Sequence, residues 1–347
     1  MKKIGIMTIY DENNYGNRLQ NYAVQEVLKS MNFQVETIKN TNLINGKNCI
    51  HNSDDVMIER KEKFLKFNEE NMINTEDILF HQHIPEDFHN DYDYFVVGSD
   101  QIWNYNFENR FSDAVFLNFA PYEKRVSFSA SFGVGEIPTE KYELYRELKG
   151  MKAISVRENT GVDLVKNITG RDDAVVLIDP TMMLSAEKWT TVMKKPEQLK
   201  SKKYILKYFL GDFSEEKKKE VERFAEENDC DIIDILDKNT FYGTGPSEFL
   251  YLIKNSFLVI TDSFHACIFS IIFNRPFLIF ERDEEGMRNM YTRIDTLLNN
   301  FELEGRKFEG KIEKLHINVN YSNAYEILAK EQEKVKEFLS KALDIKK

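Results

Sequence analysis

The chain has 347 residues, 42% of them hydrophobic and 30% charged, which is the composition of a soluble globular protein with about two ordinary domains. Its formal net charge of −11 excludes a nucleic-acid partner unless a local basic stripe exists, and stretches such as Lys194 to Lys203 indicate solvated surface instead. Three cysteines without metal-type spacing suit a reducing compartment. No apolar run is long enough to span a membrane, so we expect a cytoplasmic protein, with peripheral association at the inner face of the membrane left open.

The first forty residues alternate strand and helix. We predict a strand from Lys3 to Tyr10, a polar loop from Asp11 to Arg18, an amphipathic helix from Leu19 to Met31 and a strand from Gln34 to Ile38. This β-α-β opening is typical of a Rossmann-like domain. Its loop has one glycine, Gly16, and lacks the glycine-rich dinucleotide fingerprint, so neither a nicotinamide nor a flavin cofactor is expected.

Residues 40–90 are polar and irregular, apart from a predicted helix from Asp54 to Glu70. His81 and His83 form a His-x-His pair, and His89 follows closely. Such a pair can bind a metal, but metal sites need further ligands, and no carboxylate pattern accompanies it. An exposed loop is therefore favoured over a metal site.

A buried strand from Tyr94 to Val97 runs into a dense polar turn from Gly98 to Asn104. Gly98 permits close approach of the backbone, and the side chains that follow supply hydrogen-bond donors and acceptors. These properties suit a ligand-binding turn. The alternative is a capped turn that is anchored by Trp103.

The next elements end the predicted first domain. Thr139 to Met151 is a predicted helix, Ala153 to Glu158 a strand with Arg157 at its exit, and Ala174 to Ile178 a strand that Asp179-Pro180-Thr181 closes. Arg157 can serve a ligand or form an ion pair with Glu158 or Asp179. We place the domain boundary at Asp179-Pro180, which gives domains of residues 1–180 and 181–347.

A second α/β series follows a polar, irregular stretch from Met182 to Lys203. Its predicted strands are 204–210, 231–236, 257–260 and 277–280, and its predicted helices begin at Ser214 and span 246–255, 291–298 and 323–342. The last helix can pack back on the first domain. Two Rossmann-like halves whose loops face one cleft are the plan of the α/β class called GT-B, and this name rests on analogy.

The stretch from Phe257 to Phe280 is organised around one residue that packing does not explain. Asp262 and Ser263 are good N-cap types, and an apolar helix follows them. His265 falls in the first turn, just beyond the carboxyl end of a buried strand, where open α/β sheets bind ligands. The positive end of the helix dipole favours a neutral His265 imidazole when the site is empty. A bound phosphate favours the protonated imidazole. The protonated form can act as a general acid. The alternative is that Asp262 or Ser263 simply caps the helix and His265 is a partly buried, satisfied histidine.

Five motifs, in this order and spacing, make the chain resemble the polysaccharide pyruvyl transferase family. They are Asn14-Tyr15-Gly16-Asn17 with Leu19 to Ala23, Gly98 to Asn104, Ser155 to Glu158, Asp179-Pro180-Thr181, and Thr261-Asp262-Ser263-Phe264-His265. The resemblance implies a GT-B-like fold. It also implies transfer of the enolpyruvyl skeleton of phosphoenolpyruvate to a sugar, which makes a pyruvate ketal on a surface polysaccharide or its lipid-linked precursor, without a metal or organic cofactor.

The resemblance implies that His265 and Arg157 contact the donor, and our mechanistic hypothesis gives these two residues and Asp100 the following roles. His265 engages the donor and, in our hypothesis, protonates its methylene carbon C3. Arg157 holds the donor carboxylate or phosphate by a bidentate contact. Asp100 is a candidate base for the acceptor hydroxyl. Further substrate-binding candidates are Gly16, Asn17, Ser99, Gln101, Asp262, Ser263 and Arg293, and the 40–90 region is where we expect acceptor-specific structure.

One position departs from the family pattern. Several members have an arginine two residues before the histidine, where this chain has Ser263. Either Arg293 or Arg275 replaces that charge, or donor use differs in this branch. Arg293 can instead form a surface salt bridge.

Two other functions remain open. A GT-B glycosyltransferase that uses a nucleotide sugar needs a carboxylate for the ribose, and Glu248 is the candidate. A non-catalytic binding or scaffold protein of polysaccharide biosynthesis should tolerate His265→Ala better than an enzyme does.

Overall fold

The computed structural model describes residues 1–40, 44–45, 55–79, 84–85, 87–106, 113–281 and 292–345. The chain forms two compact units. Unit 1 comprises Met1–Cys49, Asn68–Leu184 and Ala329–Lys347, and unit 2 comprises Ile50–Phe67 and Ser185–Leu328. The expected boundary at Asp179-Pro180 lies close to the change of unit after Leu184.

Unit 1 contains a parallel five-stranded sheet in the order β5-β3-β1-β6-β7. Its strands are β1 (Lys3–Met7), β3 (Gln34–Asn40), β5 (Asn74–Leu79), β6 (Tyr94–Val97) and β7 (Arg125–Ser127). In chain order this arrangement is 3-2-1-4-5, the Rossmann order, so the direction of winding reverses between β1 and β6. β5 lies in the region expected to be irregular, and the sequence analysis missed it.

The first helix starts earlier than predicted. α1 (Tyr15–Ser30) begins four residues before the expected Leu19, because the side chain of Asn14 accepts a hydrogen bond from the N–H of Asn17 (3.1 Å) and caps the helix. Gly16 and Asn17 therefore lie in its first turn rather than in a loop. The predicted strand from Lys3 to Tyr10 is also divided, since β1 ends at Met7 and β2 (Tyr10–Asp11) pairs with β4 (Ile44–Asn45).

Smaller elements complete unit 1. β8 (Ser155–Val156) and β9 (Val175–Val176) form a parallel pair beside α3 (Asn159–Thr169). The predicted helix at 139–151 is η4 (Thr139–Gly150), a 3₁₀ helix. Short 3₁₀ turns are η1 (Phe88–Asp91), η2 (Asp113–Phe116), η3 (Tyr122–Lys124) and η5 (Pro180–Met183). The end of α9 (Ser322–Ala342) packs on this unit, where the side chain of Gln332 donates to the carbonyl of Met182 (2.7 Å).

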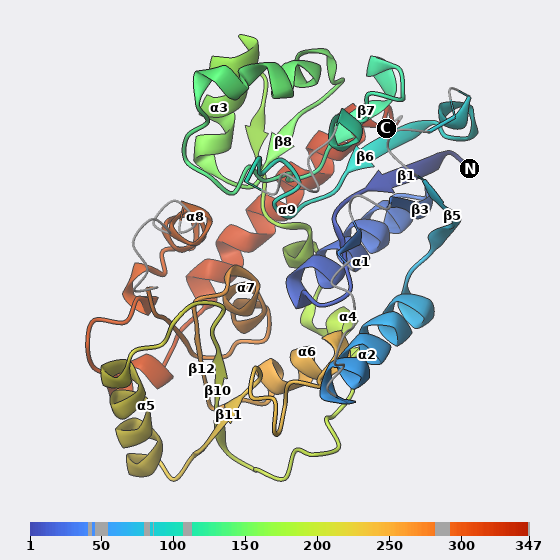
Figure 1. Ribbon diagram of the computed structural model, residues 1–347. Helices are drawn as coiled ribbons and strands as arrows, with labels where there is room; N and C mark the ends of the chain where they lie inside the picture. The colour runs from blue at the N-terminus through green and yellow to red at the C-terminus, as the bar shows by residue number, and fades with distance from the viewer. Residues whose placement is uncertain are drawn as a thin grey trace. The chain divides into compact units, whose positions relative to one another are not determined.

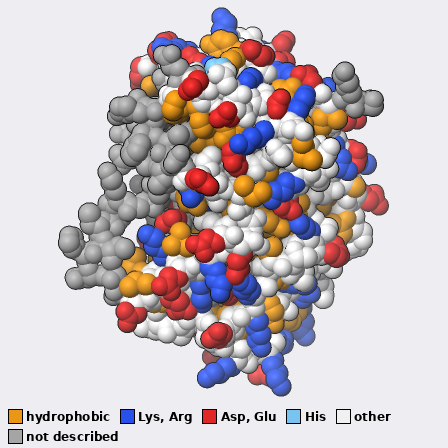
Figure 2. Space-filling view, turned by 90° about the vertical axis from the view of Figure 1, so that its right-hand side faces the viewer, with side chains coloured by type: hydrophobic (Ala, Val, Ile, Leu, Met, Phe, Trp, Pro, Cys, Tyr) orange, Lys and Arg blue, Asp and Glu red, His pale blue; other side chains and the backbone are white. Residues whose placement is uncertain are grey.

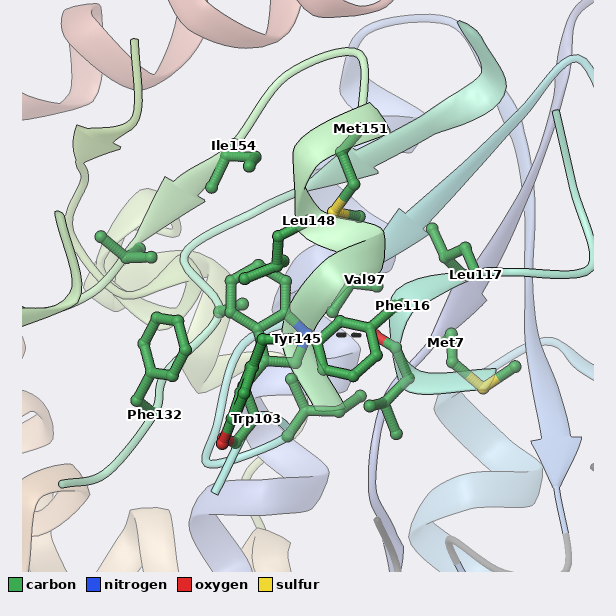
Figure 3. Close-up of a cluster of buried hydrophobic side chains, with 14 of the residues drawn as sticks. Met7, Val97, Trp103, Phe116, Leu117, Phe132, Tyr145, Leu148, Met151 and Ile154 are labelled. Atoms are coloured by element: carbon green, nitrogen blue, oxygen red, sulfur yellow. Dashed lines mark hydrogen bonds between the residues drawn. The ribbon is translucent and has the colours of Figure 1, made fainter. Parts of the chain in front are cut away.

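Trp103 anchors the polar turn after β6 in the core of unit 1 (Figure 3). Its indole N–H donates to the carbonyl of Val115 (3.0 Å), and its own carbonyl accepts from the hydroxyl of Tyr145 (2.7 Å). The ring packs against Phe116 and Phe132. This burial fixes the turn that carries the candidate residues 99–101.

Unit 2 contains a parallel four-stranded sheet in the order β11-β10-β12-β13. The strands are β10 (Tyr204–Tyr208), β11 (Asp231–Asp234), β12 (Leu258–Thr261) and β13 (Phe277–Ile279). In Figure 1, β10, β11 and β12 run side by side, with α5 and α6 on either side of them. The winding direction reverses between β10 and β12.

Apart from α4, the following helices fall close to their predicted positions. They are α2 (Asp55–Asn71), α4 (Ala186–Thr190), α5 (Glu215–Glu227), α6 (Pro246–Lys254), α7 (Phe264–Ile272) and α8 (Thr292–Phe301), with 3₁₀ turns η7 (Glu304–Arg306) and η8 (Lys314–Ile317). All nine residues of α7 are buried, which explains its apolar sequence. α4 lies in the stretch expected to be irregular.

No helix in the described ranges is long and apolar enough to cross a membrane. The face in Figure 2 carries acidic and basic side chains next to one another.

Candidate functional site

The polar residues of unit 1 meet where the winding of its sheet reverses, at the carboxyl ends of β1 and β6. The side-chain amide of Asn17, from the first turn of α1, donates to Asp100 in the turn after β6 (3.0 Å). The hydroxyl of Thr8, just after β1, lies 3.4 Å from the carbonyl oxygen of Ser99. These contacts join the two loops at the position where open α/β sheets bind ligands.

Asp100 has an unusual backbone. Its φ is +69°, in the left-handed region that side chains other than glycine seldom adopt, although aspartate tolerates it better than most. The residue is 8% exposed, and its carboxylate lies 3.9 Å from the guanidinium of Arg157. Unusual backbone at a strand end is a reason to suspect function.

Arg157 forms a buried ion pair. Its Nη1 lies 2.5 Å from the carboxylate of Asp179 and 3.3 Å from the hydroxyl of Ser99, and the two charged side chains are 1% and 0% exposed. Ser99 also donates to Asp179 (3.0 Å). Of the two ion pairs considered for this arginine, the one with Asp179 is present.

The neighbouring carboxylate has other partners. Glu158 is fully buried, and its Oε1 accepts from the hydroxyl of Ser131 (3.0 Å) and the N–H groups of Phe132 (2.7 Å) and Gly133 (3.2 Å). It therefore organises the loop after β7.

Gln101 belongs to the packing of the same loop. Its side-chain oxygen accepts from the amide of Asn104 (2.8 Å), and a Cβ on Gly133 would lie 2.2 Å from that oxygen.

Arg18 is a further candidate site residue, which was not predicted from the sequence. It is 0% exposed, and its guanidinium donates to the side-chain oxygen of Asn17 (2.5 and 3.0 Å) and to the carbonyl of Ile9 (2.7 Å). It also lies 4.2 Å from the ring of Tyr10. Burial lowers the pKa of Arg18 from its ordinary value and raises the pKa of the Tyr10 hydroxyl. The sequence analysis placed Arg18 at the end of the polar loop, and the available signal was its position directly before the predicted helix at Leu19.

The residues of unit 2 also meet where winding reverses, between β10 and β12. The carboxylate of Asp262 accepts from the backbone N–H of Leu210 (2.8 Å) and of Gly211 (2.9 Å), and so links the loops after these two strands. Ser263 is the N-cap residue of α7 by its backbone, but its side chain makes no capping hydrogen bond. Of the alternative in which Asp262 or Ser263 caps the helix, the N-cap position of Ser263 is observed, but its side-chain hydrogen bond is not.

His265 lies in the first turn of α7 and is 7% exposed. Its ring packs edge-on against Phe264, at a centroid distance of 5.4 Å. The guanidinium carbon of Arg293 lies 5.8 Å from the centroid of the same Phe264 ring, and Arg293 is 8% exposed. Arg293 is therefore buried beside the start of α7.

Arg275 lies at the opposite end of α7 from Ser263. It follows the helix, which ends at Ile272, and the seven helical steps from His265 to Ile272 rise by roughly 10 Å. Its carbonyl instead accepts from the hydroxyl of Tyr321 (2.7 Å).

The candidate residues thus form two groups. Gly16, Asn17, Ser99, Asp100, Gln101 and Arg157 lie in unit 1, and Asp262, Ser263, His265 and Arg293 lie in unit 2. His89 lies in η1, and His81 and His83 lie outside the described residues.

These parallel sheets, each with polar residues where its winding reverses, define an α/β protein of the GT-B class. The chain belongs to the polysaccharide pyruvyl transferase family, whose model matches residues 14–284. A comparison with curated proteins finds no match.

Solved structures share the fold at low sequence identity. The UDP-GlcNAc 2-epimerase of Methanocaldococcus jannaschii has a TM-score of 0.53 and 13% identity, over 95% of this chain and 92% of that one. The S. aureus MnaA-UDP structure has a TM-score of 0.52 and 14% identity, over 97% and 91%. An alpha-glucosyltransferase in complex with UDP and DNA has a TM-score of 0.50 and 9% identity, over 99% of both chains.

Proposed function

We propose that the protein transfers the enolpyruvyl skeleton of phosphoenolpyruvate to a sugar of a surface polysaccharide or its lipid-linked precursor, forming a pyruvate ketal. The family match supports a transferase that acts on polysaccharide. The observation that carries the proposal is His265, held in the first turn of α7 beside the loops that Asp262 joins. A helix N-terminus favours the donor phosphate, and that phosphate favours a protonated imidazole.

The proposed chemistry uses His265 as the acid. The imidazolium gives its proton to C3 of phosphoenolpyruvate, which becomes the methyl group, and one sugar hydroxyl adds to C2. The bond from C2 to the phosphate oxygen breaks, phosphate leaves, and a second hydroxyl closes the ketal on C2. Of the two hydroxyl protons, one reloads His265 and the other leaves with the phosphate. Asp100 is the proposed base for an acceptor hydroxyl.

Positive charge for the donor comes, in this proposal, from Arg293. Arg157 is already paired with Asp179, so we assign it first to holding the turn of Ser99 and Asp100. A direct contact between Arg157 and the donor stays a prediction. Gly16, Asn17, Ser99 and Gln101 are proposed to shape the acceptor side. The protein is proposed to work in the cytoplasm, at or near the inner face of the membrane, without a cofactor.

The test is heat stabilisation by phosphoenolpyruvate, followed by detection of the ketal methyl group and of released phosphate. A ligand at a hundredfold excess over its dissociation constant stabilises by about 2.7 kcal/mol, which is readily visible. His265→Ala should abolish the response, and His316→Ala, a half-buried histidine of the same unit, should keep it. A wild-type protein that ignores phosphoenolpyruvate would overturn the proposal.

The same assay with a nucleotide sugar tests the second candidate, a GT-B glycosyltransferase. Two of the similar structures contain UDP, which is the observation in its favour. The proposed ribose carboxylate, Glu248, already accepts from the N–H of Gly245 (3.1 Å) at the start of α6. The third candidate is a non-catalytic binding or scaffold protein. It would be favoured if wild type forms no product and the His265→Ala variant still binds phosphoenolpyruvate.

A further inference from the structure

A lysine-lined cavity of about 290 Å³ lies within unit 2, apart from His265. Three segments of the chain form it: one face of α2, the stretch 194–198 and the first turn of α6. Its ammonium groups come from Lys63, Lys66, Lys194 and Lys195. We propose that this cavity binds a phosphate-bearing sugar.

The walls of the cavity are held together by specific contacts. Arg60 of α2 is 4% exposed, and its guanidinium donates to the carbonyls of Tyr242 (3.0 Å) and Thr244 (3.4 Å), in the loop that leads into α6. The backbone N–H of Lys194 donates to the carbonyl of Ser247 (3.2 Å), which joins the stretch 194–198 to the start of α6.

Two glycines allow the loop before α6 to lie directly on α2. A Cβ on Gly243 would be 2.5 Å from the carboxylate of Glu59, and a Cβ on Gly245 would be 2.6 Å from the Cβ of Lys63. Real side chains do not approach so closely. The Glu59 carboxylate is the far end of a flexible side chain and can move aside, whereas the Cβ of Lys63 is fixed to its backbone, so a larger residue at position 245 would force the wall apart. The cavity is therefore a constructed feature of the fold and not a gap between loosely placed side chains.

The charges divide into two kinds. Lys63 is paired with Glu59 (2.7 Å), and Lys66, Lys194 and Lys195 add three further positive charges that attract an anion. The first turn of α6 adds the positive end of its dipole, where Glu248 accepts the N–H of the N-cap residue Gly245 (3.1 Å). Glu59, Glu197 and Glu248 supply carboxylates, and Gln198 and Ser247 supply neutral polar groups. Lysines suit a phosphate and carboxylates suit sugar hydroxyls, so the combination fits a sugar phosphate better than a bare polyanion.

The position in the fold also suits a ligand. α6 follows β11 and leads into β12 of a parallel sheet, so its N-terminus lies on the carboxyl side of that sheet, as does the N-terminus of α7. The volume is close to the lower end of small-molecule sites, which is about 300 Å³. α2 lies in the 40–90 region, where acceptor-specific structure was expected. The inference does not depend on the chemistry proposed for His265.

The experiment measures affinity for glucose 1-phosphate, with pyrophosphate, glucose and phosphoenolpyruvate as parallel probes, by calorimetry at physiological salt. Lys66→Glu and Lys195→Glu reverse two charges of the cavity. Lys61→Glu, exposed on α2, and Lys200→Glu, exposed after the 194–198 stretch, are the matched controls. We expect each cavity variant to weaken glucose 1-phosphate binding by about tenfold or more, because each reversal removes an attraction for the phosphate and adds a repulsion. The controls should bind as wild type does.

Three results would overturn the inference: no binding of glucose 1-phosphate by wild type, an equal loss in the controls, or unchanged affinity in both cavity variants. If pyrophosphate binds as tightly as glucose 1-phosphate, the inference that the cavity recognises a sugar would also be wrong. The proposed function is judged separately. His265→Ala should abolish the response to phosphoenolpyruvate and leave glucose 1-phosphate binding unchanged, and the cavity variants should do the reverse.

Discussion

The buried pair of Arg157 and Asp179 makes a quantitative prediction about the stability of unit 1. Asp179 accepts from Arg157 (2.5 Å), from the hydroxyl of Ser99 (3.0 Å), and from the N–H (3.0 Å) and hydroxyl (2.7 Å) of Thr181. Removing one partner of a buried ion pair leaves an uncompensated charge, which costs about 3–5 kcal/mol. We expect Arg157→Met and Asp179→Asn each to lower the free energy of unfolding by that amount, out of a total of about 5–15 kcal/mol.

The double variant separates the pair energy from other effects. Arg157→Met with Asp179→Asn leaves neither charge, so its cost should be below the sum of the single costs by about 2–3 kcal/mol, which is within the usual range for coupled neighbours. The chain has two tryptophans, and Trp103 lies in unit 1 while Trp189 lies in unit 2. Urea unfolding followed by fluorescence in a Trp189→Phe background therefore reports on unit 1 alone.

Exposed Arg146 and Glu143, 2.7 Å apart, provide the control pair, and Arg146→Met should change the unfolding curve very little. Additive single costs, or single costs below about 1 kcal/mol, would refute the reasoning that the pair is desolvated and coupled. The double variant also decides the role of Arg157. If it folds but no longer responds to phosphoenolpyruvate, Arg157 contacts the donor. If the response returns, Arg157 acts by holding its loop.

Three further predictions concern single residues. Gly133→Ala should destabilise unit 1 by about 1–3 kcal/mol in urea unfolding, since φ is +65° and the new Cβ would meet Gln101; an unchanged midpoint would contradict this. Asp262→Ala should cost about 1–3 kcal/mol, because two backbone N–H groups lose their acceptor, and amide exchange should rise at 210 and 211 first. Hydrogen bonds from Arg223 lower the pKa of Glu220, so its stabilisation is complete above the ordinary carboxyl value near 4.3 and is lost as pH falls through the lowered value. Glu220→Gln should flatten the acid side of the stability profile, and a profile parallel to wild type would count against the shift.

The strands were predictable because parallel strands buried on both faces are continuous apolar runs. β6, β12 and β13 were found within a residue or two on this basis. β5, with the sequence Asn-Thr-Glu-Asp-Ile-Leu, has no such run, and its place at the edge of the sheet removes the need for one. The start of α1 was missed because Asn14 was taken as part of a polar loop rather than as a cap.

The candidate site was predictable in position but not in pairing. Residues that follow buried strands were correctly placed at the carboxyl ends of the sheets, because that rule needs the sequence alone. Which side chains bond to which could not be read in the same way. Asp262 reaches across to Leu210 and Gly211, 52 and 51 residues away in the chain, and Arg157 reaches Asp179 rather than Asp100 as its closest acid. Such contacts follow from strand order, which a single sequence does not contain.

The serine at position 263 illustrates the same limit for electrostatics. A helix N-terminus supplies roughly half a unit of positive charge. This does not balance a doubly charged phosphate, so a further cation beside α7 would strengthen phosphate binding. Ser263 brings no charge, and Arg275 lies at the other end of the helix.

Arg293 is thirty residues further along the chain, yet its guanidinium lies over the ring of Phe264, which in turn contacts His265. A guanidinium within about 6 Å of an aromatic centroid is held by attraction to that ring, so the stack itself positions the charge. In the proposed function, Arg293 therefore takes the place of the arginine that the family pattern has at residue 263, because the field at α7 depends on where charge lies in space and not on where the motif places it in the sequence.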